Sequence, residues 1–267
     1  MVALGSAFTA CSTAVPPPVA IPRPLPEPPP VTSTWEPPPY IPPGQHTVAT
    51  RLRQFGTAAR ERWQPWFADA GIAYPADVVV LVGLKHERRL QVYAGPTWRR
   101  LAFVRDLPWT ATSGGPGPKL REGDRQIPEG TYDIESLNPN SRFHVSLRVG
   151  YPNEHDRRTA AREGRTRLGG DIMIHGGDRS IGCIAVGDEA AEDLFVLAAD
   201  VGLENIEVVL APRDFRRMDT LARTPSRPVW LRGLYTQLAA ALQNLPPATV
   251  NTARGGADSV QVGWPLP

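Results

Sequence analysis

The stretch DIMIHGGDRSIGCIAVGDEAAEDLF, residues 171–195, joins two short apolar runs to the beginning of a helix. DIMIH and GCIAV are predicted strands, and the glycines of GGDRSI permit the turn that would connect them. His175 and Cys183 would then lie near the same end of a sheet, where an imidazole and a thiol can meet. The residues that follow predict a helix with Asp188 as its N-cap and Gly202 at its end.

Apolar runs of the same kind occur on both sides of this stretch, all of them after Pro75. Turn residues separate most of these runs, and this pattern predicts antiparallel strands in a β-sandwich or open barrel. The predicted strands cover residues 77–85, 88–95, 99–107, 130–137, 143–151, 171–176, 182–186 and 205–212.

Two further segments carry apolar residues at helical spacing, one before the strands and one after them. The first helix is predicted over Thr50–Ala70, and the last helix is predicted after Pro228. The chain is therefore expected to be mainly β, with one inserted helix and flanking N- and C-terminal helices. The apolar faces are formed by Leu52, Phe55, Ala59, Trp63, Trp66 and Phe67 in the first helix, and by Leu231, Leu234, Tyr235, Leu238, Leu242 and Leu245 in the last.

The composition of the 267-residue chain is that of a globular protein with appendages. Hydrophobic residues make up 41% of the sequence, which suffices for a core. The net charge of +2 comes from interspersed arginine and acidic residues rather than from a basic block, so nucleic-acid binding is not expected. No apolar run approaches the roughly 20 residues of a membrane-spanning helix.

The N-terminal residues 1–15 look like the end of a secretory signal that lacks its basic front and most of its apolar part. FTAC resembles a bacterial lipobox, so we expect an upstream start and a lipid on Cys11. The alternative is a disordered cytosolic tail with an incidental cysteine. Residues 16–46 are rich in proline, which favours an extended spacer between the lipid and the folded part.

With Cys11 assigned to a lipid, Cys183 has no disulfide partner, and this favours a working thiol over a structural one. A neighbouring imidazole or helix N-terminus lowers the pKa of a thiol from about 8.5 and so favours the reactive thiolate. On spacing alone, an inert buried cysteine beside a hydrogen-bonded histidine explains His175 and Cys183 equally well. No further cysteine or clustered histidine supplies zinc ligands, so neither a metal nor an organic cofactor is expected.

The residues around this pair carry a more specific signal. The pattern IHGG…SIGCIAVGDEAAEDLF, within 174–195, resembles the active-site segment of the L,D-transpeptidase (YkuD-type) catalytic domain. The segment SGGPGPK…RVGYPN, residues 113–153, resembles the YafK-like branch of that family. The resemblance covers about 77–212 and implies an L,D-transpeptidase-like β fold. It implies that Cys183 is the nucleophile that takes the acyl group of a peptidoglycan stem peptide, and that His175 is its general base and later acid.

Two positions depart from the usual pattern of the family. Ile181 stands where a second histidine usually precedes the glycine, and Ala185 stands where a basic residue soon follows the cysteine. The second departure raises the question of how a substrate carboxylate is bound. Basic residues of PKLREGDRQIPEG are candidates, because a guanidinium can bind a carboxylate with two hydrogen bonds, or else they form a solvated charged loop: Lys119, Arg121 and Arg125.

Several neighbouring residues are candidates for substrate binding. Ser180 and Gly182 match the Ser/Thr and Gly of the family's pattern, and Ser180 either bonds near the thiolate or caps the loop. Gly182 would let a substrate backbone approach closely, and Gly176 permits a turn that a β-carbon would obstruct. Backbone N–H groups near Gly182 and Cys183 would stabilise a tetrahedral oxyanion. His144 either lines the cleft or has a plain surface or core role.

The resemblance implies a cysteine-dependent L,D-transpeptidase that acts on peptidoglycan stem peptides through an acyl-enzyme. Two alternatives stay open: a hydrolase that uses the same site to release a cross-link or an attached protein, as some YafK-like members are regarded as doing, and a non-catalytic wall-binding module. The expected partners are stem peptides, wall-attached protein, and a membrane reached through the lipid on Cys11. The expected location is the periplasm of a bacterial cell envelope.

The predicted organisation has five parts. They are a truncated signal or lipobox-like segment at 1–15, a proline-rich linker at 16–46, an N-terminal helix at 47–75, the catalytic domain at 77–212, and a C-terminal helix with a polar tail at 213–267.

Overall fold

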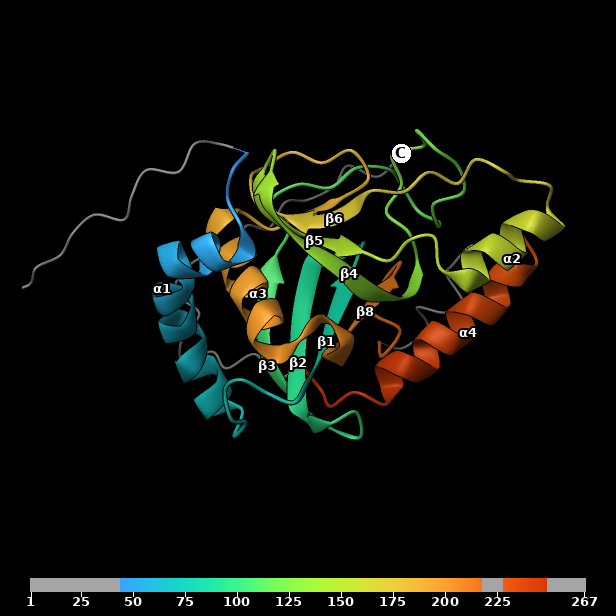
Figure 1. Ribbon diagram of the computed structural model, residues 1–267. Helices are drawn as coiled ribbons and strands as arrows, with labels where there is room; N and C mark the ends of the chain where they lie inside the picture. Colours follow the sequence, from blue (N-terminus) through green and yellow to red (C-terminus); the bar gives the residue numbers. More distant parts are fainter. Residues whose placement is uncertain (1–43, 218–227, 249–267) are drawn as a thin grey trace, which may run out of the picture. The chain divides into compact units, whose positions relative to one another are not determined.

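A mixed β-sheet with helices on both faces makes up the described part of the chain, residues 44–217 and 228–248 of the computed structural model (Figure 1). The expected signal-like segment with Cys11, nearly all of the proline-rich linker and most of the polar tail lie outside these residues. None of the helices in this part of the chain combines the length and the apolar character of a membrane span.

The strands form one eight-stranded sheet in the order β3-β2-β1-β8-β4-β5-β6-β7. Each strand coincides with one of the predicted apolar runs, and the prediction of a mainly β protein is confirmed. The strands are β1 (Val78–Leu84), β2 (Arg89–Thr97), β3 (Arg100–Pro108), β4 (Gly130–Ser141), β5 (His144–Val149), β6 (Ile172–His175), β7 (Ile184–Ala185) and β8 (Ile206–Ala211).

Two strand pairs differ from the predicted antiparallel arrangement: β1 and β8 are parallel, and so are β6 and β7. Strands β1 and β8 are separated in the chain by all the other strands, so no tight turn has to join this parallel pair. Strands β6 and β7 are consecutive and parallel, so the short loop between them must bring the chain back along the sheet before β7 begins. Gly177 and Gly182 permit this because their φ angles, +71° and +100°, lie in the left-handed region that glycine adopts without strain.

The described residues contain four α-helices and one short 3-10 helix. Three of the α-helices were predicted, whereas α2 was missed because it has no apolar stripe: of its residues only Thr159 and Ala160 are buried. A signal for its start was present, since Asn153 and Asp156 form a reciprocal capping box. The helices are α1 (Val48–Asp69), α2 (Glu154–Arg162), α3 (Asp188–Val201), η1 (Leu203–Asn205) and α4 (Trp230–Gln243).

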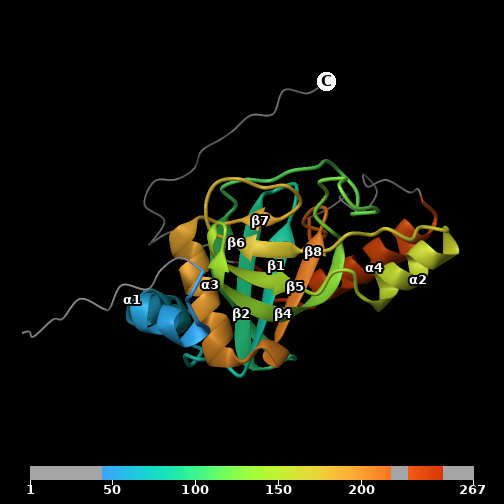
Figure 2. The ribbon, with the colours of Figure 1, turned by 45° about the horizontal axis from the view of Figure 1, so that its top comes forward.

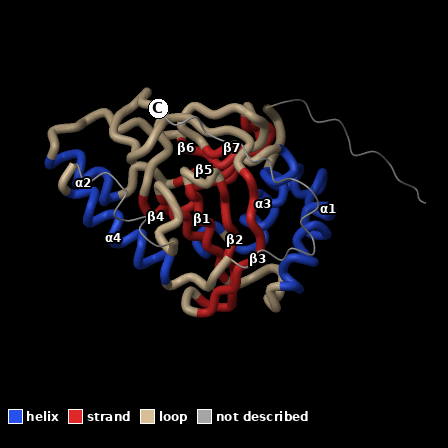
Figure 3. The backbone as a smooth tube through the Cα atoms, turned by 180° about the vertical axis from the view of Figure 1, so that it is seen from behind, coloured by secondary structure: helices blue, strands red, loops and turns tan. Residues whose placement is uncertain are grey.

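Helices cover both faces of the central strands (Figures 1 and 3). Helices α1 and α3 pack on one face, and α4 packs on the other. Strand β1 is therefore apolar along its whole length: Val79 and Leu81 belong to the core under α1 and α3, while Val80 and Val82 belong to the core under α4. The site described below lies at the far edge of the sheet, at β6 and β7.

The prediction that Asp188 is the N-cap of α3 is wrong. The N-cap is Gly187, which has no side chain to bond the helix, and Asp188 is the first helical residue. The Asp188 carboxylate instead accepts the backbone N–H of Gly177 at 2.7 Å. It therefore ties the β6–β7 loop to the beginning of α3, which a cap confined to the helix would not do.

Candidate active site

Strands β6 and β7 lie side by side at one edge of the sheet (Figure 2); His175 ends β6, and Cys183 directly precedes β7. Ile174 and Ile184 are opposite each other in this parallel pair, and both side chains are buried in the core. Because side chains alternate along a strand, His175 points away from that core. Cys183 directly precedes Ile184, in the bend that ends the β6–β7 loop. The pairing of Ile174 with Ile184 therefore places the backbone next to Cys183 beside the strand that His175 ends.

The imidazole of His175 is fixed in one orientation. Its side chain is buried, its ring is stacked on Phe143 with 4.6 Å between ring centroids, and Nδ1 lies 2.6 Å from the carbonyl oxygen of Gly176. A carbonyl oxygen only accepts hydrogen bonds, so Nδ1 carries the proton and Nε2 keeps its lone pair. Burial lowers the pKa of His175, against a smaller opposing effect of the Gly176 carbonyl. The ring is therefore a neutral base at neutral pH.

The thiol of Cys183 is half-buried and free of any disulfide. Its Sγ lies 3.5 Å from the carbonyl oxygen of Asp171, to which the thiol donates. Burial raises the pKa of the Cys183 thiol and the Asp171 carboxylate adds to this, whereas the N–H of Met173 and the charge of Lys119 oppose it. The expectation of a thiol with a lowered pKa is thus wrong for the protein without substrate, because burial of the thiol outweighs the N–H of Met173 and the charge of Lys119.

The turn before Cys183 is held by two serine hydroxyls. The Ser180 hydroxyl donates to the carbonyl oxygen of Cys183 at 2.6 Å and accepts the N–H of Cys183 at 3.2 Å, so it caps the loop. The Ser113 hydroxyl accepts the N–H of Gly182 at 2.5 Å. Both N–H groups that were expected to bind an oxyanion are therefore occupied, and a substrate oxygen must displace a hydroxyl to reach them.

Gly176 is required by the close approach of other chain segments. A β-carbon at this position would lie 2.4 Å from the Asp188 carboxylate and 2.9 Å from the Phe143 carbonyl oxygen, so something would have to shift. At Gly182 a β-carbon would lie 3.3 Å from the Gln126 carbonyl oxygen. The loop between β3 and β4 thus occupies part of the space over Gly182.

A groove of about 400 Å³ opens beside the Cys183 turn. Ile181 stands at this groove with 78% of its surface exposed, although it is a large apolar residue. Basic and acidic side chains share the lining, so the groove has no single sign of charge. Its lining residues are Lys119, Glu122, Gly123, Arg125, Gly169, Gly170, Asp171, Ile172 and Ile181.

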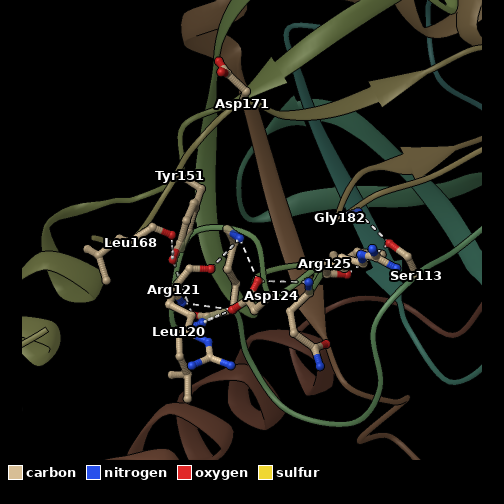
Figure 4. Close-up of polar contacts among 12 residues, drawn as sticks. Ser113, Leu120, Arg121, Asp124, Arg125, Tyr151, Leu168, Asp171 and Gly182 are labelled. Carbon is tan, nitrogen blue, oxygen red and sulfur yellow. Dashed lines mark hydrogen bonds and ion pairs between the residues drawn. The ribbon is translucent and has the colours of Figure 1, made fainter. Parts of the chain in front are cut away.

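The three basic residues proposed for a substrate carboxylate have different surroundings; Arg121 and Arg125 are labelled in Figure 4. Lys119 is buried, and its Nζ is 2.7 Å from a carboxylate oxygen of Asp124, which also accepts the N–H groups of Leu120, Arg121 and Gln126. Arg121 is exposed and does not line the groove. Arg125 is exposed and lines it. Of the three, Arg125 is therefore the one that both lines the groove and lacks a carboxylate partner in the described contacts.

His144 does not line this groove. Its Nε2 lies 2.8 Å from a carboxylate oxygen of Glu192 on α3, and its ring packs against Phe55 of α1 with 5.9 Å between centroids. The hypothesis that His144 faces the cleft is wrong, because the ring turns toward the helices and joins α1 and α3 to the sheet.

Ser113, Phe143 and Asp124 were not singled out in the sequence, although they shape the site. The glycines of SGGPG marked the loop of Ser113 as irregular but gave no partner for its hydroxyl. No group of three or more His, Cys, Asp or Glu side chains that could hold a metal ion is found in residues 44–217 and 228–248.

Comparison with known proteins identifies the family of the region that contains the sheet. The model of the L,D-transpeptidase catalytic domain (YkuD) matches residues 77–209. YafK of Escherichia coli (strain K12), provisionally named an L,D-transpeptidase, is 33% identical over 142 residues, which are 51% of this chain and 53% of that protein. The chain thus spans about half the length of this relative.

Two solved structures with low sequence identity are also similar. The helical cell shape determining protein Pgp2 from Campylobacter jejuni is 23% identical with a TM-score of 0.41, covering 55% of this chain and 54% of that chain. L,D-transpeptidase 1 of Mycobacterium tuberculosis is 15% identical with a TM-score of 0.30, covering 50% of this chain and 61% of that chain.

Proposed function

Because residues 77–209 match the model of the L,D-transpeptidase catalytic domain, we propose that this protein is a cysteine-dependent acyltransferase acting on peptidoglycan stem peptides. The observation that carries the proposal is the fixed tautomer of His175 on the strand paired with the segment of Cys183. It leaves a basic nitrogen on the strand next to the segment that carries the thiol. An inert buried cysteine has no need of such a neighbour.

The proposed reaction uses these two side chains in turn. Nε2 of His175 takes the proton of the Cys183 thiol while the sulfur attacks the carbonyl carbon of a stem-peptide amide. His175 then gives the proton to the leaving amine, the C–N bond breaks, and a thioester on Cys183 remains. A second amine attacks this thioester and passes a proton to His175, which returns it to the departing sulfur.

The protonation states fit general-base catalysis better than a resting ion pair. Burial lowers the pKa of His175 and raises the pKa of Cys183, so both groups are neutral before the substrate binds. The proton must therefore move during the attack. This makes the position of Nε2 relative to the thiol decisive for the rate.

Incubation of the full chain with purified muropeptides, followed by mass spectrometry, tests the proposal. We expect new or cleaved peptide products and a covalent adduct on Cys183, while Cys183→Ala forms neither and keeps the melting temperature of the wild type. If the wild type binds muropeptides without forming an adduct or product, the protein is a wall-binding module instead.

Hydrolysis at the same site is the second candidate. It is favoured by Ala185, which is fully buried at the position where the family usually has a basic residue, and by the pairing of Lys119 with Asp124. An incoming acceptor thus has fewer cationic contacts, whereas water needs only access to the thioester. Reaction in oxygen-18 water separates the two: label in the released carboxylate marks hydrolysis, and an unlabelled new amide to an added amine marks transfer.

The proposal places the protein in the periplasm of a bacterial cell envelope, where such substrates are found. The lipid on Cys11 stays a prediction. Intact-mass analysis of protein from the membrane fraction tests it: an added diacylglyceryl group on Cys11 is expected, and an unmodified Cys11 in a cytosolic fraction contradicts it.

A further inference from the structure

Ser113 joins three segments of the chain around the candidate nucleophile (Figure 4). Its hydroxyl accepts the N–H of Gly182 at 2.5 Å and donates to the carbonyl oxygen of Arg125 at 3.0 Å. It also lies 3.3 Å from the hydroxyl of Ser180, which itself bonds both backbone groups of Cys183. One side chain, 69 residues before Gly182, thus contacts the turn that carries the thiol.

The loop that carries Ser113 is itself held in place, so it can act as a support. The side-chain oxygen of Gln126 accepts the N–H of Gly115 at 3.1 Å, and Asp124 binds Lys119 and three backbone N–H groups of the same loop. Lys85 of the segment after β1 donates to the carbonyl oxygens of Gly117 at 2.6 Å and Ile127 at 3.0 Å. A hydroxyl fixed in this way has a defined position relative to the sheet.

The loop also contacts the β6–β7 segment at Gly177 and at Ala185, one before and one after the Cys183 turn. The hydroxyl of Thr110 donates to the carbonyl oxygen of Gly177 at 2.7 Å, and the N–H of Thr110 donates to the carbonyl oxygen of Ala185 at 2.9 Å. These bonds hold the two segments together without touching Gly182 or Cys183. Thr110 therefore offers a matched comparison for Ser113, because both hydroxyls join the same segments.

We propose that Ser113 is a positioning residue for the Cys183 thiol: its hydroxyl holds the N–H of Gly182 and so fixes the turn that carries the thiol beside β6. The part that concerns catalysis rests on the proposed function. Gly182 has a φ angle of +100° and, as a glycine, can adopt many other backbone conformations. The shape of the turn therefore depends on hydrogen bonds from other segments of the chain. Without Ser113, the N–H of Gly182 loses its partner and the thiol gains freedom to move toward water.

Removal of the hydroxyl should therefore change two measured rates in opposite directions. In Ser113→Ala, muropeptide turnover should fall by at least about tenfold with KM little changed, since a misplacement of about 1 Å can cost about a hundredfold. Alkylation of Cys183 by iodoacetamide near pH 8 should become faster, because a less buried thiol ionises more readily. Ser113→Thr, which keeps a hydroxyl, should restore both rates to within about threefold of the wild type.

Thr110→Val is the control, expected to leave both rates within about twofold of the wild type. If Ser113→Ala and Thr110→Val lower turnover equally and alkylation does not change, Ser113 only packs the loop and the proposal is overturned. An unchanged turnover in Ser113→Ala, with an active wild type, also overturns it. If the wild type forms no adduct or product, the proposed function fails, and alkylation alone decides: faster labelling of Ser113→Ala supports the positioning role, and equal labelling overturns it.

Discussion

The β6–β7 edge and the layer between α1 and α3 both contain a histidine within a polar cluster, but they satisfy their polar groups in different ways. In the helical layer, His144 is bonded to Glu192, and the buried carboxylate of Asp193 receives Arg62 and Arg105, each at 2.7 Å. Every charge in that cluster has a charged partner on another element. The side chains thereby join α1, α3 and β3.

At the β6–β7 edge, the partners are mostly backbone groups and hydroxyls. His175 is bonded to a carbonyl oxygen, and Cys183 is in contact with a carbonyl oxygen and an N–H. Neutral partners orient a side chain without charging it, so one imidazole nitrogen remains basic and the thiol remains protonated. Charged pairs thus connect the elements of the helical layer, whereas neutral partners leave His175 and Cys183 uncharged at the β6–β7 edge.

The largest expected effect comes from removing the base at the β6–β7 edge. His175→Gln should lower muropeptide turnover by about 10²–10⁴-fold, because general-base catalysis typically contributes this much. Initial rates at saturating substrate measure it, with circular dichroism to verify the fold. A rate within a few-fold of the wild type would remove His175 from the proposed mechanism.

In the helical layer the largest effect should be on stability. Asp193→Ala leaves Arg62 and Arg105 without their buried partner and should lower the free energy of unfolding by about 3 kcal/mol, near the low end for a broken buried pair because both arginines are partly exposed. Urea unfolding measures this. The control is Glu154→Ala, which breaks an exposed pair with Arg158 and should cost less than about 1 kcal/mol. Equal losses in both variants would contradict the distinction between the two kinds of pair.

The pH dependence of alkylation tests whether neutral partners keep the thiol protonated. Burial raises the pKa of Cys183, so a higher pH is needed to form the reactive thiolate in the folded protein. The iodoacetamide rate should therefore rise with pH and reach its half-maximum above the value of about 8.5 expected for the same cysteine in urea. A half-maximum at or below that of the unfolded chain would indicate a stabilised thiolate.

The smallest effect is expected for the other histidine. His144→Gln keeps a polar side chain but loses the bond to Glu192, so the free energy of unfolding should fall by about 1 kcal/mol. Muropeptide turnover should stay within about twofold of the wild type, because the ring faces α1 and α3. Thermal unfolding and initial rates check the two expectations, and a large loss of turnover at unchanged stability would return His144 to the active site.

Local patterns were sufficient to predict the elements and the neighbourhood of the site. The apolar residues of α1 and α4 recur at helical spacing because each helix buries one face, and that spacing is visible without any knowledge of the partner. His175 and Cys183 are close in sequence, so two strands and a glycine turn were enough to expect them at one edge. Helix α2 escaped the same reasoning because it buries almost nothing.

Long-range packing decided what the sequence alone left open. The parallel pairing of β1 with β8, the bond from Ser113 to Gly182, the turning of His144 toward Glu192 and the engagement of Lys119 by Asp124 all depend on how preformed elements meet. The raised pKa of Cys183 has the same origin, since it reflects how deeply the folded chain buries the sulfur. Residue types and spacing thus determined which side chains with reactive groups lie near one another in the sequence. The tertiary structure decided which of these groups are buried or already hydrogen-bonded, because burial and hydrogen-bond partners are set by segments distant in the chain.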